Sequence, residues 1–283
     1  MAKIEAVITG GLGNQMFVAA TALAVASRTR STLIFNLQNY NKNNIRDYEL
    51  DSFNLLHSIK KKQGRINILN KIEEKLKIEK KTNFRERCFC FDPRILELEN
   101  DVKLIGYFQS WRYFEDIKDE IKNIFKPDRK NRITEDIEKA VGRKYFAAHV
   151  RRGDYLLPSA SKVHGLVSEE YVLEELENLR NFGPERLPRV LFSDSPETLS
   201  PFFRSKFDYV VDPKRARRPF DHLSALSFAS GLVLSNSSFS WWAGYLGDKS
   251  DRIVVVPNKW FRTLNPTISD LILENWRVSE IDW

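Results

Sequence analysis

Residues 4–14 read Ile-Glu-Ala-Val-Ile-Thr-Gly-Gly-Leu-Gly-Asn, a short apolar run that ends in a glycine-rich turn. An alanine-rich, helix-forming segment follows directly, at about residues 15–26. A buried strand, a tight turn and a helix in this order are typical of an α/β fold with a parallel sheet. We therefore take this segment as the first βα unit of such a fold.

The glycine-rich turn is also a candidate ligand site. A turn of this kind lets backbone N–H groups approach a phosphate at the positive end of the helix dipole. It completes neither a Walker loop nor Gly-x-Gly-x-x-Gly, and a plain tight turn would look the same. Gly11, Gly13 and Asn14 are the candidate binding residues, and Gln15 would add a second side-chain amide beside Asn14.

Strand and helix signals alternate along the rest of the chain, which predicts further parallel α/β structure. The charged stretch at residues 129–132 follows a proline stop and is predicted to be a linker. We therefore expect two α/β domains, residues 1–130 and 131–283. The expected strands are residues 4–8, 32–37, 102–107, 145–150, 189–192, 209–211, 232–234 and 253–256. The expected helices are residues 15–26, 114–125, 168–181, 219–228 and 238–246.

The composition is that of a basic globular protein, with 42% hydrophobic residues and a formal net charge of +7. Such a charge suits nucleic acid, an anionic membrane or a phosphate-bearing substrate. No zinc-finger, RNP-type or Lys/Arg-rich tail motif supports nucleic-acid binding. The N-terminus lacks the pattern of a signal peptide, and no stretch has the roughly 18 uncharged residues of a membrane span, so we expect a cytoplasmic protein.

Much of the positive charge lies in residues 60–87, where apolar residues recur at roughly helical spacing. This segment could lie on an anionic bilayer, or it could be a solvated helix that covers the core. The only two cysteines, Cys88 and Cys90, follow the segment. We expect them to be small apolar residues on one face of a strand, not a disulfide or half of a metal site.

The apolar strand at residues 145–150 leads into His149-Val150-Arg151-Arg152-Gly153-Asp154. Two adjacent arginines at the end of a buried strand are costly unless an anion neutralises them. A guanidinium binds a diphosphate through two parallel hydrogen bonds, and neighbouring side chains of a strand point to opposite faces. We predict that Arg151, which shares a face with His149, holds phosphate, and that Arg152 supports the fold. An ion pair with Asp154 would account for one arginine without any ligand.

A third motif, Ser-Asn-Ser-Ser-Phe-Ser-Trp-Trp at residues 235–242, follows the strand at 232–234 and opens a helix. Small hydroxyl residues at a helix start form an anion site and cap the helix. Ser237 and Ser238 could offer both N–H and hydroxyl groups to a phosphate. A serine-capped helix with two tryptophans in the core is the structural alternative.

Four motifs in this order resemble the bacterial α-1,2-fucosyltransferase family. They are Gly-Gly-Leu-Gly-Asn-Gln-Met-Phe at 10–17, Gly-Tyr-Phe-Gln-Ser-Trp-Arg-Tyr-Phe at 106–114, His-Val-Arg-Arg-Gly-Asp-Tyr at 149–155 and the serine motif. The resemblance implies a GT-B fold of two Rossmann-like domains, the first on the acceptor side and the second binding GDP-fucose. It also implies inverting transfer to a galactosyl acceptor without a metal.

The resemblance further implies roles for single residues. Arg151 would neutralise the β-phosphate, His149 and Asp221 would lie near the guanine, and Asn14 would lie by the transferred sugar. Ser193-Asp194-Ser195-Pro196 stands where the family usually has Ser-Asp-Asp with a nearby tryptophan. The donor-binding candidates are Gly11, Gly13, Asn14, His149, Arg151, Arg152, Asp194, Asp221, Ser237, Ser238 and Phe239. The catalytic candidates are Arg151, Asp154 and Asn14.

The sequence contains no Asp-x-Asp pair of the kind that holds a divalent cation on a donor diphosphate. We therefore expect no metal and no cofactor, with arginine and helix N-termini neutralising the leaving group. Asp154 is the first candidate for the general base, with orientation of Arg152 as its alternative role, and His164 and Glu169 follow. The acceptor could be lipid-linked, given the basic window. An α-1,6- or protein-O-type fucosyltransferase and a basic nucleic-acid-binding protein are the competing hypotheses.

Overall fold

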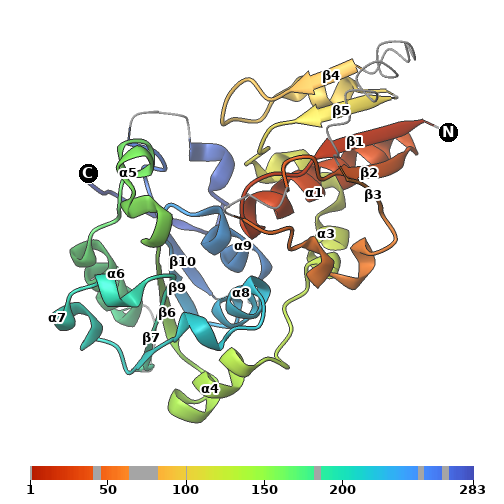
Figure 1. Cartoon of the computed structure of the whole chain (residues 1–283). Coiled ribbons are helices and arrows are strands. Elements are labelled where there is room, and N and C mark those ends of the chain that lie inside the picture. The colour runs from red at the N-terminus through yellow and green to blue at the C-terminus, as the bar shows by residue number, and fades with distance from the viewer. Residues whose placement is uncertain are drawn as a thin grey trace. The chain divides into compact units, whose positions relative to one another are not determined.

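The computed structural model describes residues 2–40, 46–63, 82–99, 101–181, 186–247, 252–262 and 268–283. The chain divides into two compact units, Met1–Phe125 and Lys126–Trp283, each built on one parallel sheet (Figure 1). The division falls at Phe125, ahead of the boundary expected near residue 130. Arg132, expected in a linker, instead begins helix α4 (Arg132–Val141), because the Asn131 side chain accepts a hydrogen bond from the Thr134 N–H at 2.9 Å and caps it.

Unit 1 contains a five-stranded sheet in the order β3-β2-β1-β5-β4, and all neighbours are parallel. Its strands are β1 (Lys3–Val7), β2 (Thr32–Asn36), β3 (Lys60–Lys62), β4 (Thr82–Arg85) and β5 (Val102–Ile105). Helix α1 (Leu12–Thr29) follows β1, as the sequence predicts, and its alanines allow the helix to pack closely on the sheet. The short edge strands β3 and β4 were not predicted.

The helix expected at residues 114–125 is broken into two parts. Residues Trp111–Ile117 form 3₁₀ turns, and α3 covers only Lys118–Ile124. Phe114 interrupts the helix with φ −131° and ψ 21°, and its buried ring lies 6.2 Å from that of Phe17 on α1. Tertiary packing of the aromatic ring therefore overrides the helical periodicity here.

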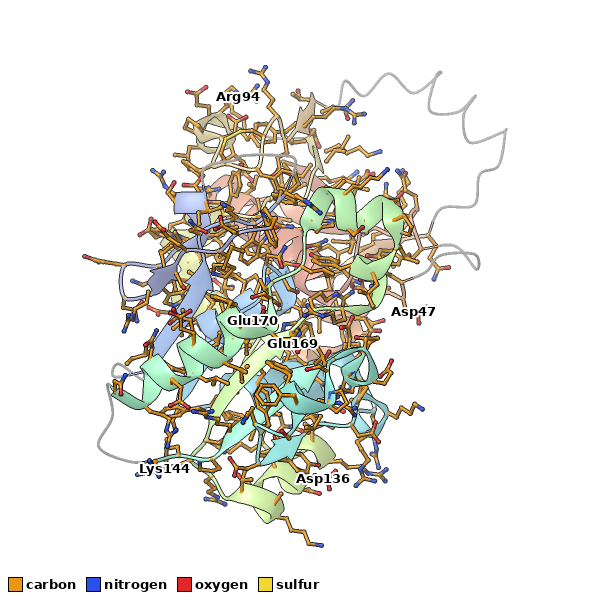
Figure 2. The ribbon with its side chains drawn as sticks, turned by 90° about the vertical axis from the view of Figure 1, so that its left-hand side faces the viewer. Asp47, Arg94, Asp136, Lys144, Glu169 and Glu170 are labelled. Carbon is orange, nitrogen blue, oxygen red and sulfur yellow. A yellow bond between two sulfur atoms is a disulfide. The ribbon has the colours of Figure 1, made fainter. Side chains whose placement is uncertain are left out.

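Unit 2 contains a six-stranded parallel sheet in the order β11-β10-β9-β6-β7-β8. Its strands are β6 (Phe146–Val150), β7 (Arg189–Ser193), β8 (Tyr209–Val210), β9 (Gly231–Val233), β10 (Ile253–Pro257) and β11 (Arg277–Ser279). Its other helices are α5 (Pro158–His164), α6 (Glu169–Asn181), α7 (Pro201–Arg204), α8 (Pro219–Ser227) and α9 (Ser238–Leu246). Helix α6 begins with Glu169 and Glu170, whose charge favours the positive end of the helix dipole (Figure 2).

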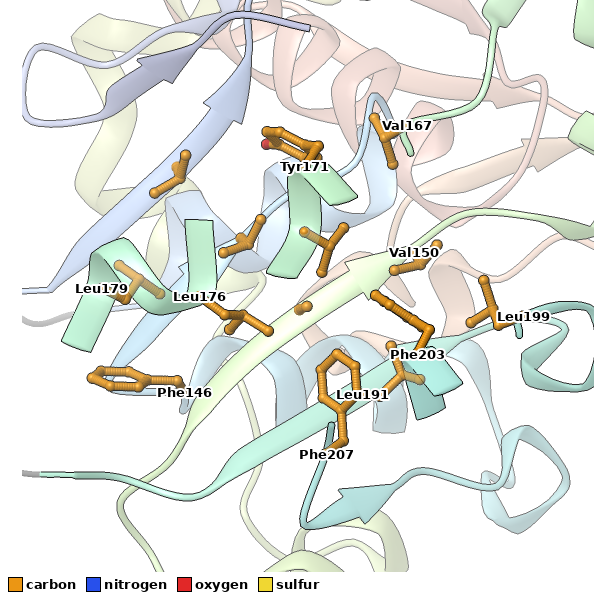
Figure 3. Close-up of a cluster of buried hydrophobic side chains, with 14 of the residues drawn as sticks. Phe146, Val150, Val167, Tyr171, Leu176, Leu179, Leu191, Leu199, Phe203 and Phe207 are labelled. Atoms are coloured by element: carbon orange, nitrogen blue, oxygen red, sulfur yellow. The ribbon is translucent and has the colours of Figure 1, made fainter. Parts of the chain in front are cut away.

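The core of unit 2 lies where α6 and α7 pack on the sheet (Figure 3). Val150 of β6 and Leu191 of β7 meet Leu176 of α6 and Phe203 of α7, and all four are fully buried. Each such side chain contributes about 1.5–3 kcal/mol by leaving water. Every residue of β6 is buried, as expected of a central strand with helices on both faces. This rigid strand carries the basic motif at its carboxyl end.

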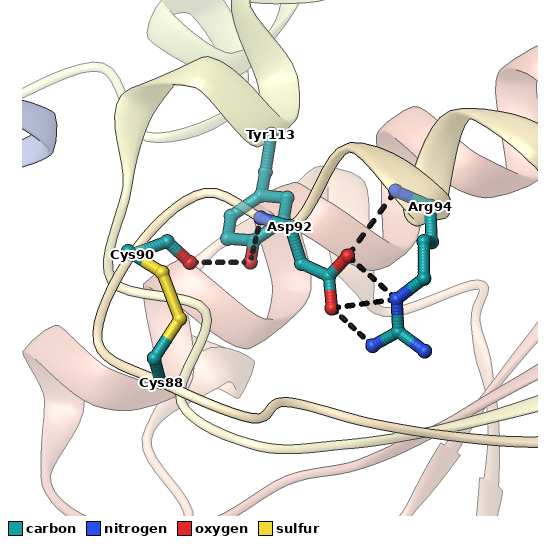
Figure 4. The surroundings of a disulfide bond; sticks show 5 residues. All are labelled: Cys88, Cys90, Asp92, Arg94 and Tyr113. Carbon is teal, nitrogen blue, oxygen red and sulfur yellow. Dashed lines mark hydrogen bonds and ion pairs between the residues drawn. A yellow bond between two sulfur atoms is a disulfide. The ribbon is translucent and has the colours of Figure 1, made fainter.

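The prediction for Cys88 and Cys90 was wrong, because the two residues form a disulfide (Figure 4). Strand β4 ends at Arg85, and the chain bends at residues 88–90. In a straight strand, residues two apart are separated by about 6.5 Å. The bend reduces the Cα–Cα distance to 5.3 Å, within the range that a disulfide spans.

The helical interpretation of residues 60–87 was wrong at both ends of that window. Lys60–Lys62 is strand β3 and Thr82–Arg85 is strand β4, each at an edge of the sheet. Lysines suit an edge strand because their charge discourages pairing with another chain. Residues 64–81 lie outside the described residues. In the described parts of the chain, no helix has the length and apolar character needed to cross a membrane.

Candidate functional site

The order in which the strands of unit 2 follow one another along the sheet reverses between β6 and β9. From β6 the chain proceeds to β7 and β8 on one side, and then returns to β9 on the other. In open α/β sheets, ligands bind beyond the carboxyl ends of the strands at such a switch point. The basic motif follows β6 and the serine motif follows β9, so the topology brings these two predicted motifs together.

Arg151 lies at this switch point between two carboxylates. Its Nη1 is 2.7 Å from Oδ2 of Asp194, and its Nη2 donates to Oδ1 of Asp154. The guanidinium carbon also lies 5.5 Å from the centre of the Tyr155 ring. The side chain is 17% exposed, so the guanidinium is held in place and remains open to solvent. Two paired carboxylates provide the negative charge that the sequence argument required.

Arg152 is buried, with 7% of the residue exposed. Its Nη1 donates to the carbonyl of Arg151 at 3.0 Å, and its Nη2 donates to the carbonyl of Val167 at 3.1 Å. Burial lowers the pKa of this guanidinium from its usual value. Arg152 therefore ties two backbone segments together. The suggestion that Asp154 orients Arg152 was wrong, because Asp154 pairs with Arg151.

Asp194 connects the end of β7 to the basic motif. Its Oδ1 accepts a hydrogen bond from the Arg152 N–H at 2.8 Å, while its Oδ2 pairs with Arg151. The carboxylate therefore fixes both the backbone and one side chain of the motif. In the structure Asp194 contacts Arg151 and Arg152, which are also candidates for binding the donor.

His149 is fully enclosed next to Arg151. Its Nδ1 lies 2.9 Å from the Ser235 hydroxyl, and its ring centre lies 5.5 Å from that of Phe239. Burial, together with the positive charge of Arg151 and the nearby His222, lowers the pKa of His149 to about 3. The imidazole is therefore neutral at physiological pH. It links the basic motif to the serine motif across adjacent strands.

Helix α9 starts at Ser238, as predicted, with Ser237 as its N-cap residue. Within the described residues, Ser237 makes no side-chain capping bond to the helix. The first turn, with Ser238 and Phe239 partly exposed, therefore presents helix N–H groups close to the end of β6. Asn236 is structural, because its Nδ2 donates to the carbonyls of His164 and Trp260. A helix N-terminus beside a guanidinium is suited to a phosphate.

Asp221 lies in the first turn of α8 and is buried. Its Oδ2 accepts hydrogen bonds from the N–H groups of Arg217 at 3.1 Å and Arg218 at 3.2 Å. The carboxylate thus caps the start of α8. The next residue, His222, lies close to the basic motif, because its ring centre is 6.3 Å from that of Phe192 on β7 and its charge acts on His149.

Unit 1 has a switch point of its own, between β1 and β5. Gly10 adopts a positive φ of 76°, and Gly11 is the N-cap of α1. Gly13 is buried in the first turn, and Asn14 lies beside it, where its Oδ1 accepts a hydrogen bond from Gln109 Nε2 at 3.0 Å. Gln109 follows β5, so the two sides of this switch point are joined.

The suggestion that Gln15 adds an amide to the site was wrong. Gln15 is fully buried, and its Nε2 donates to the carbonyls of Gly10 and Asp47 at 2.9 and 2.8 Å. Its Oε1 accepts a hydrogen bond from the Glu49 N–H. Both polar atoms of the Gln15 side chain therefore form hydrogen bonds with the backbone. Two of these bonds are with Asp47 and Glu49, which lie more than 30 residues away in the sequence.

The two weaker candidates for a base also have structural partners. Glu169 accepts hydrogen bonds from the N–H and hydroxyl groups of Ser200 at the start of α7. The His164 ring stacks on Tyr155 with centres 4.4 Å apart, and burial lowers the pKa of His164. Tyr155 was missed from the sequence as a site residue. Its hydroxyl donates to the Asn236 carbonyl at 3.2 Å and so ties the basic motif to the serine motif.

Among the described residues, no group of three or more His, Cys, Asp or Glu side chains is arranged to hold a metal ion. The polar groups gathered at the switch point of unit 2 are the Arg151 guanidinium, helix N–H groups and hydroxyls, together with the Asp154 and Asp194 carboxylates that pair with Arg151. Such a set can hold a phosphate and neutralise charge that develops on it.

A family model described as "Glycosyl transferase family 11" matches residues 94–279. The chain is 28% identical over 290 residues to an alpha-1,2-colitosyltransferase from Escherichia coli, covering 98% of both proteins. It is 26% identical over 261 residues to a galactoside 2-alpha-L-fucosyltransferase from Caenorhabditis elegans, covering 86% of this chain and 68% of that protein.

Among solved structures, the fucosyltransferase NodZ from Bradyrhizobium resembles this chain with a TM-score of 0.55. The sequences are 14% identical, and the match covers 86% of this chain and 92% of the other. At this identity the likeness concerns the fold alone. It confirms the predicted class, an α/β protein of the GT-B type.

Proposed function

Because the chain belongs to glycosyl transferase family 11, we propose that it transfers L-fucose from GDP-β-L-fucose to the 2-hydroxyl of a galactosyl acceptor. The relative from Caenorhabditis elegans is named galactoside 2-alpha-L-fucosyltransferase, and this name supports the choice of fucose as the transferred sugar and of a galactoside as the acceptor. The observation that carries the proposal is the junction of the two motifs. The His149 ring lies 5.5 Å from that of Phe239 in the first turn of α9, and Tyr155, whose ring lies beneath the Arg151 guanidinium, donates to the Asn236 carbonyl. This junction is the arrangement that a nucleoside diphosphate leaving group requires.

In the proposed reaction, Arg151 and the first N–H groups of α9 hold the diphosphate. As the bond between fucose and GDP breaks, negative charge grows on the β-phosphate, and these groups stabilise it. The acceptor hydroxyl attacks from the opposite side, so the configuration at the anomeric carbon inverts. Arg151 has to exchange at least one of its two carboxylate partners for phosphate. Asp154 is the better candidate to leave, because Asp194 is also bound to the Arg152 N–H.

Asp154 remains our first candidate for the general base. Once released from Arg151, its carboxylate would be free to accept the proton of the acceptor hydroxyl. Its side chain is 37% exposed, which allows it to turn away from Arg151. Asn14 remains our candidate for the residue beside the transferred sugar. We propose that no metal or other cofactor takes part, since arginine and helix N–H groups already provide the positive charge.

Incubation with GDP-fucose and a panel of small galactosides, read by mass spectrometry, tests the proposal. We expect a product heavier by one deoxyhexose, and NMR of that product separates a 1,2 linkage from the α-1,6 alternative. The absence of product and of GDP binding by calorimetry would contradict the proposal. Tight, steeply salt-dependent binding to random DNA in place of GDP binding would favour the nucleic-acid alternative.

A second donor sugar is favoured by the relative named alpha-1,2-colitosyltransferase, which matches almost the full chain. Transfer of colitose by this chain is therefore our second candidate function. Competition between the two nucleotide sugars for one acceptor decides between them. A higher kcat/KM with activated colitose than with GDP-fucose would reverse our choice.

We also propose that the enzyme acts in the cytoplasm and contacts the inner membrane face, where a lipid-linked acceptor would lie. The support is the basic window at residues 60–87, of which Lys60 and Lys62 are exposed on an edge strand. Neutralising Lys60 and Lys62 should weaken binding to anionic liposomes by about 1 kcal/mol per charge. Lack of binding by the wild type at low salt would rule out this contact.

A further inference from the structure

Two side-chain oxygens at the switch point of unit 1 are buried without hydrogen-bond partners among the described residues. They are Oε1 of Glu86, just after β4, and Oε1 of Gln109, just after β5. Gln109 is only 7% exposed. Native proteins pair nearly all buried polar atoms, so two orphan acceptors near each other need an explanation. An amide oxygen and an ionised carboxylate oxygen both accept hydrogen bonds, which indicates a ligand that donates them.

The turn at residues 106–109 is shaped around Glu86. A Cβ on Gly106 would come within 2.5 Å of the Glu86 Cβ and 2.7 Å of its Oε2, so only glycine leaves room. Phe108 adopts a positive φ of 53°, which is unfavourable for a non-glycine residue. This conformation turns backbone N–H groups toward the carboxylate, and the Tyr107 N–H donates to Glu86 Oε2 at 2.7 Å.

The surroundings of Glu86 have opposing effects on its charge. Burial raises the pKa of Glu86, against the lowering effect of the N–H groups of Phe108, Tyr107 and Gln109. Oε2 accepts the hydrogen bond from the Tyr107 N–H, and the N–H groups of Phe108 and Gln109 also face the carboxylate. The buried Oε1 has no hydrogen-bond partner among the described residues, and this is the atom that a ligand could reach.

Gln109 also connects this turn to the glycine-rich turn. Its Nε2 donates to Asn14 Oδ1, which fixes the orientation of the Asn14 amide. The Asn14 Nδ2 therefore lies over Gly10, where an added Cβ would come within 2.7 Å of it. Partly exposed aromatic rings flank the turn, since Tyr107 stacks on Phe89 with centres 6.3 Å apart. Flat rings beside polar oxygens are suited to a sugar, which has apolar C–H faces and hydroxyl edges.

We propose that the Gly106–Gln109 turn is a hydroxyl-binding site for the acceptor sugar, in which the Oε1 atoms of Glu86 and Gln109 receive hydroxyl hydrogens. The inference rests on the proposed function, because it names the part of unit 1 that recognises the acceptor. Gln109 has a second role as a positioning residue for Asn14.

The test measures the acceptor and the nucleotide separately. Glu86→Gln keeps the size of the side chain and one acceptor for the Tyr107 N–H, but it loses the charge. Gln109→Met keeps the length and removes both polar groups. We expect each variant to raise the KM for a galactoside acceptor about ten- to a hundredfold, because a hydrogen bond to a sugar hydroxyl is lost. The Kd for GDP, read by calorimetry, should change less than twofold.

Glu5→Gln is the matched control, because Glu5 is a buried glutamate of the same sheet with partners of its own. It accepts a hydrogen bond from Asn36 Nδ2 at 2.6 Å and lies near Lys62 and Lys103. We expect this variant to lower Tm and to leave the acceptor KM unchanged. If Glu86→Gln and Gln109→Met raised the acceptor KM and the Kd for GDP by the same factor, the two residues would have a structural role only. That result would overturn the inference.

Direct binding distinguishes this inference from the proposed function. Saturation-transfer NMR with methyl β-galactopyranoside in the presence of GDP should show contact in the wild type and a weaker signal in both variants. A signal that is unchanged in the variants, or absent from a wild type that binds GDP, would overturn the inference. Failure of the wild type to bind GDP would instead contradict the proposed function.

Discussion

The backbone of Gly153 lies against the carboxylate of Asp194 so closely that a Cβ at position 153 would be 2.1 Å from Oδ2. The same Oδ2 pairs with Arg151 at 2.7 Å. Gly153 also has a positive φ of 29°. The glycine in the basic motif is therefore needed for two reasons: it turns the chain after Arg152, and it leaves room for the carboxylate that holds Arg151.

Gly153→Ala should destabilise the protein and weaken GDP binding together. The added methyl group displaces the Asp194 carboxylate and strains the backbone, which should cost roughly 2–3 kcal/mol in the free energy of unfolding. Gly142→Ala is the control, since Gly142 also has a positive φ but nothing lies within 4 Å of its Cβ position. Urea melts and GDP calorimetry are the measurements. If Gly153→Ala and Gly142→Ala changed the Kd for GDP equally, the position of the Asp194 carboxylate would have no effect on GDP binding.

Arg151→Lys should keep the fold and lose nearly all turnover. An ammonium cannot form the two parallel bonds of a guanidinium, and one lost contact to a leaving phosphate costs about 3 kcal/mol, roughly a hundredfold in kcat. Arg152→Lys should instead lower Tm, because one ammonium cannot span the carbonyls of Arg151 and Val167. An Arg151→Lys enzyme that is fully active and binds GDP normally would place the donor elsewhere.

Asp154→Asn separates the two roles considered for Asp154. The change removes a carboxylate that competes with phosphate for Arg151, so GDP should bind several-fold more tightly. If Asp154 is also the base, kcat should fall about 10²–10⁴-fold with the amide. The two effects have opposite signs, and calorimetry and initial rates read them separately. Tighter GDP binding with an unchanged kcat would remove Asp154 from the list of bases.

His149 should make the protein less stable in acid. Its pKa is about 3 in the folded protein and 6.5 when unfolded, so the unfolded chain binds more protons between these values. Stability from this group is therefore complete above pH 6.5 and is lost as pH falls toward 3, by at most about 1.4 kcal/mol per pH unit. Urea melts of wild type and His149→Gln at pH 7 to 4 test this. Parallel curves for the two proteins would show that His149 is not buried as described.

Activity should survive an excess of EDTA. In the proposed reaction, Arg151 and the start of α9 would supply the positive charge that a divalent cation would otherwise bring to the diphosphate. Initial rates with EDTA, and then with added Mg²⁺ or Mn²⁺, should differ by no more than a few fold. Complete loss of turnover with EDTA, restored by one cation, would show that a metal takes part.

Most of the fold could be read from local patterns. The strands that precede the glycine, arginine and serine motifs were predicted correctly. Each is a short apolar run that ends at a polar or glycine-rich motif, which is the pattern of a buried parallel strand. Helix α9 was predicted to the residue, because its serines mark a helix start. The edge strand β3 was missed, since three consecutive lysines have no apolar pattern and pair only because β2 is there.

The candidate residues of the site also follow from the sequence, because each motif ends a predicted strand. The sequence determined which residues are too costly to bury without a partner, as for Arg151 and Arg152. The sequence also offered Asp154 as an ion-pair partner for one arginine, and the structure has this pair with Arg151. Only the tertiary structure decided the partners that lie far along the chain. Asp194, Asp47 and Gln109 lie 32 to 95 residues away from the groups they contact, in Arg152, Gln15 and Asn14. Their positions depend on strand order, which no local pattern encodes, because it is set by how whole sheets close around a core.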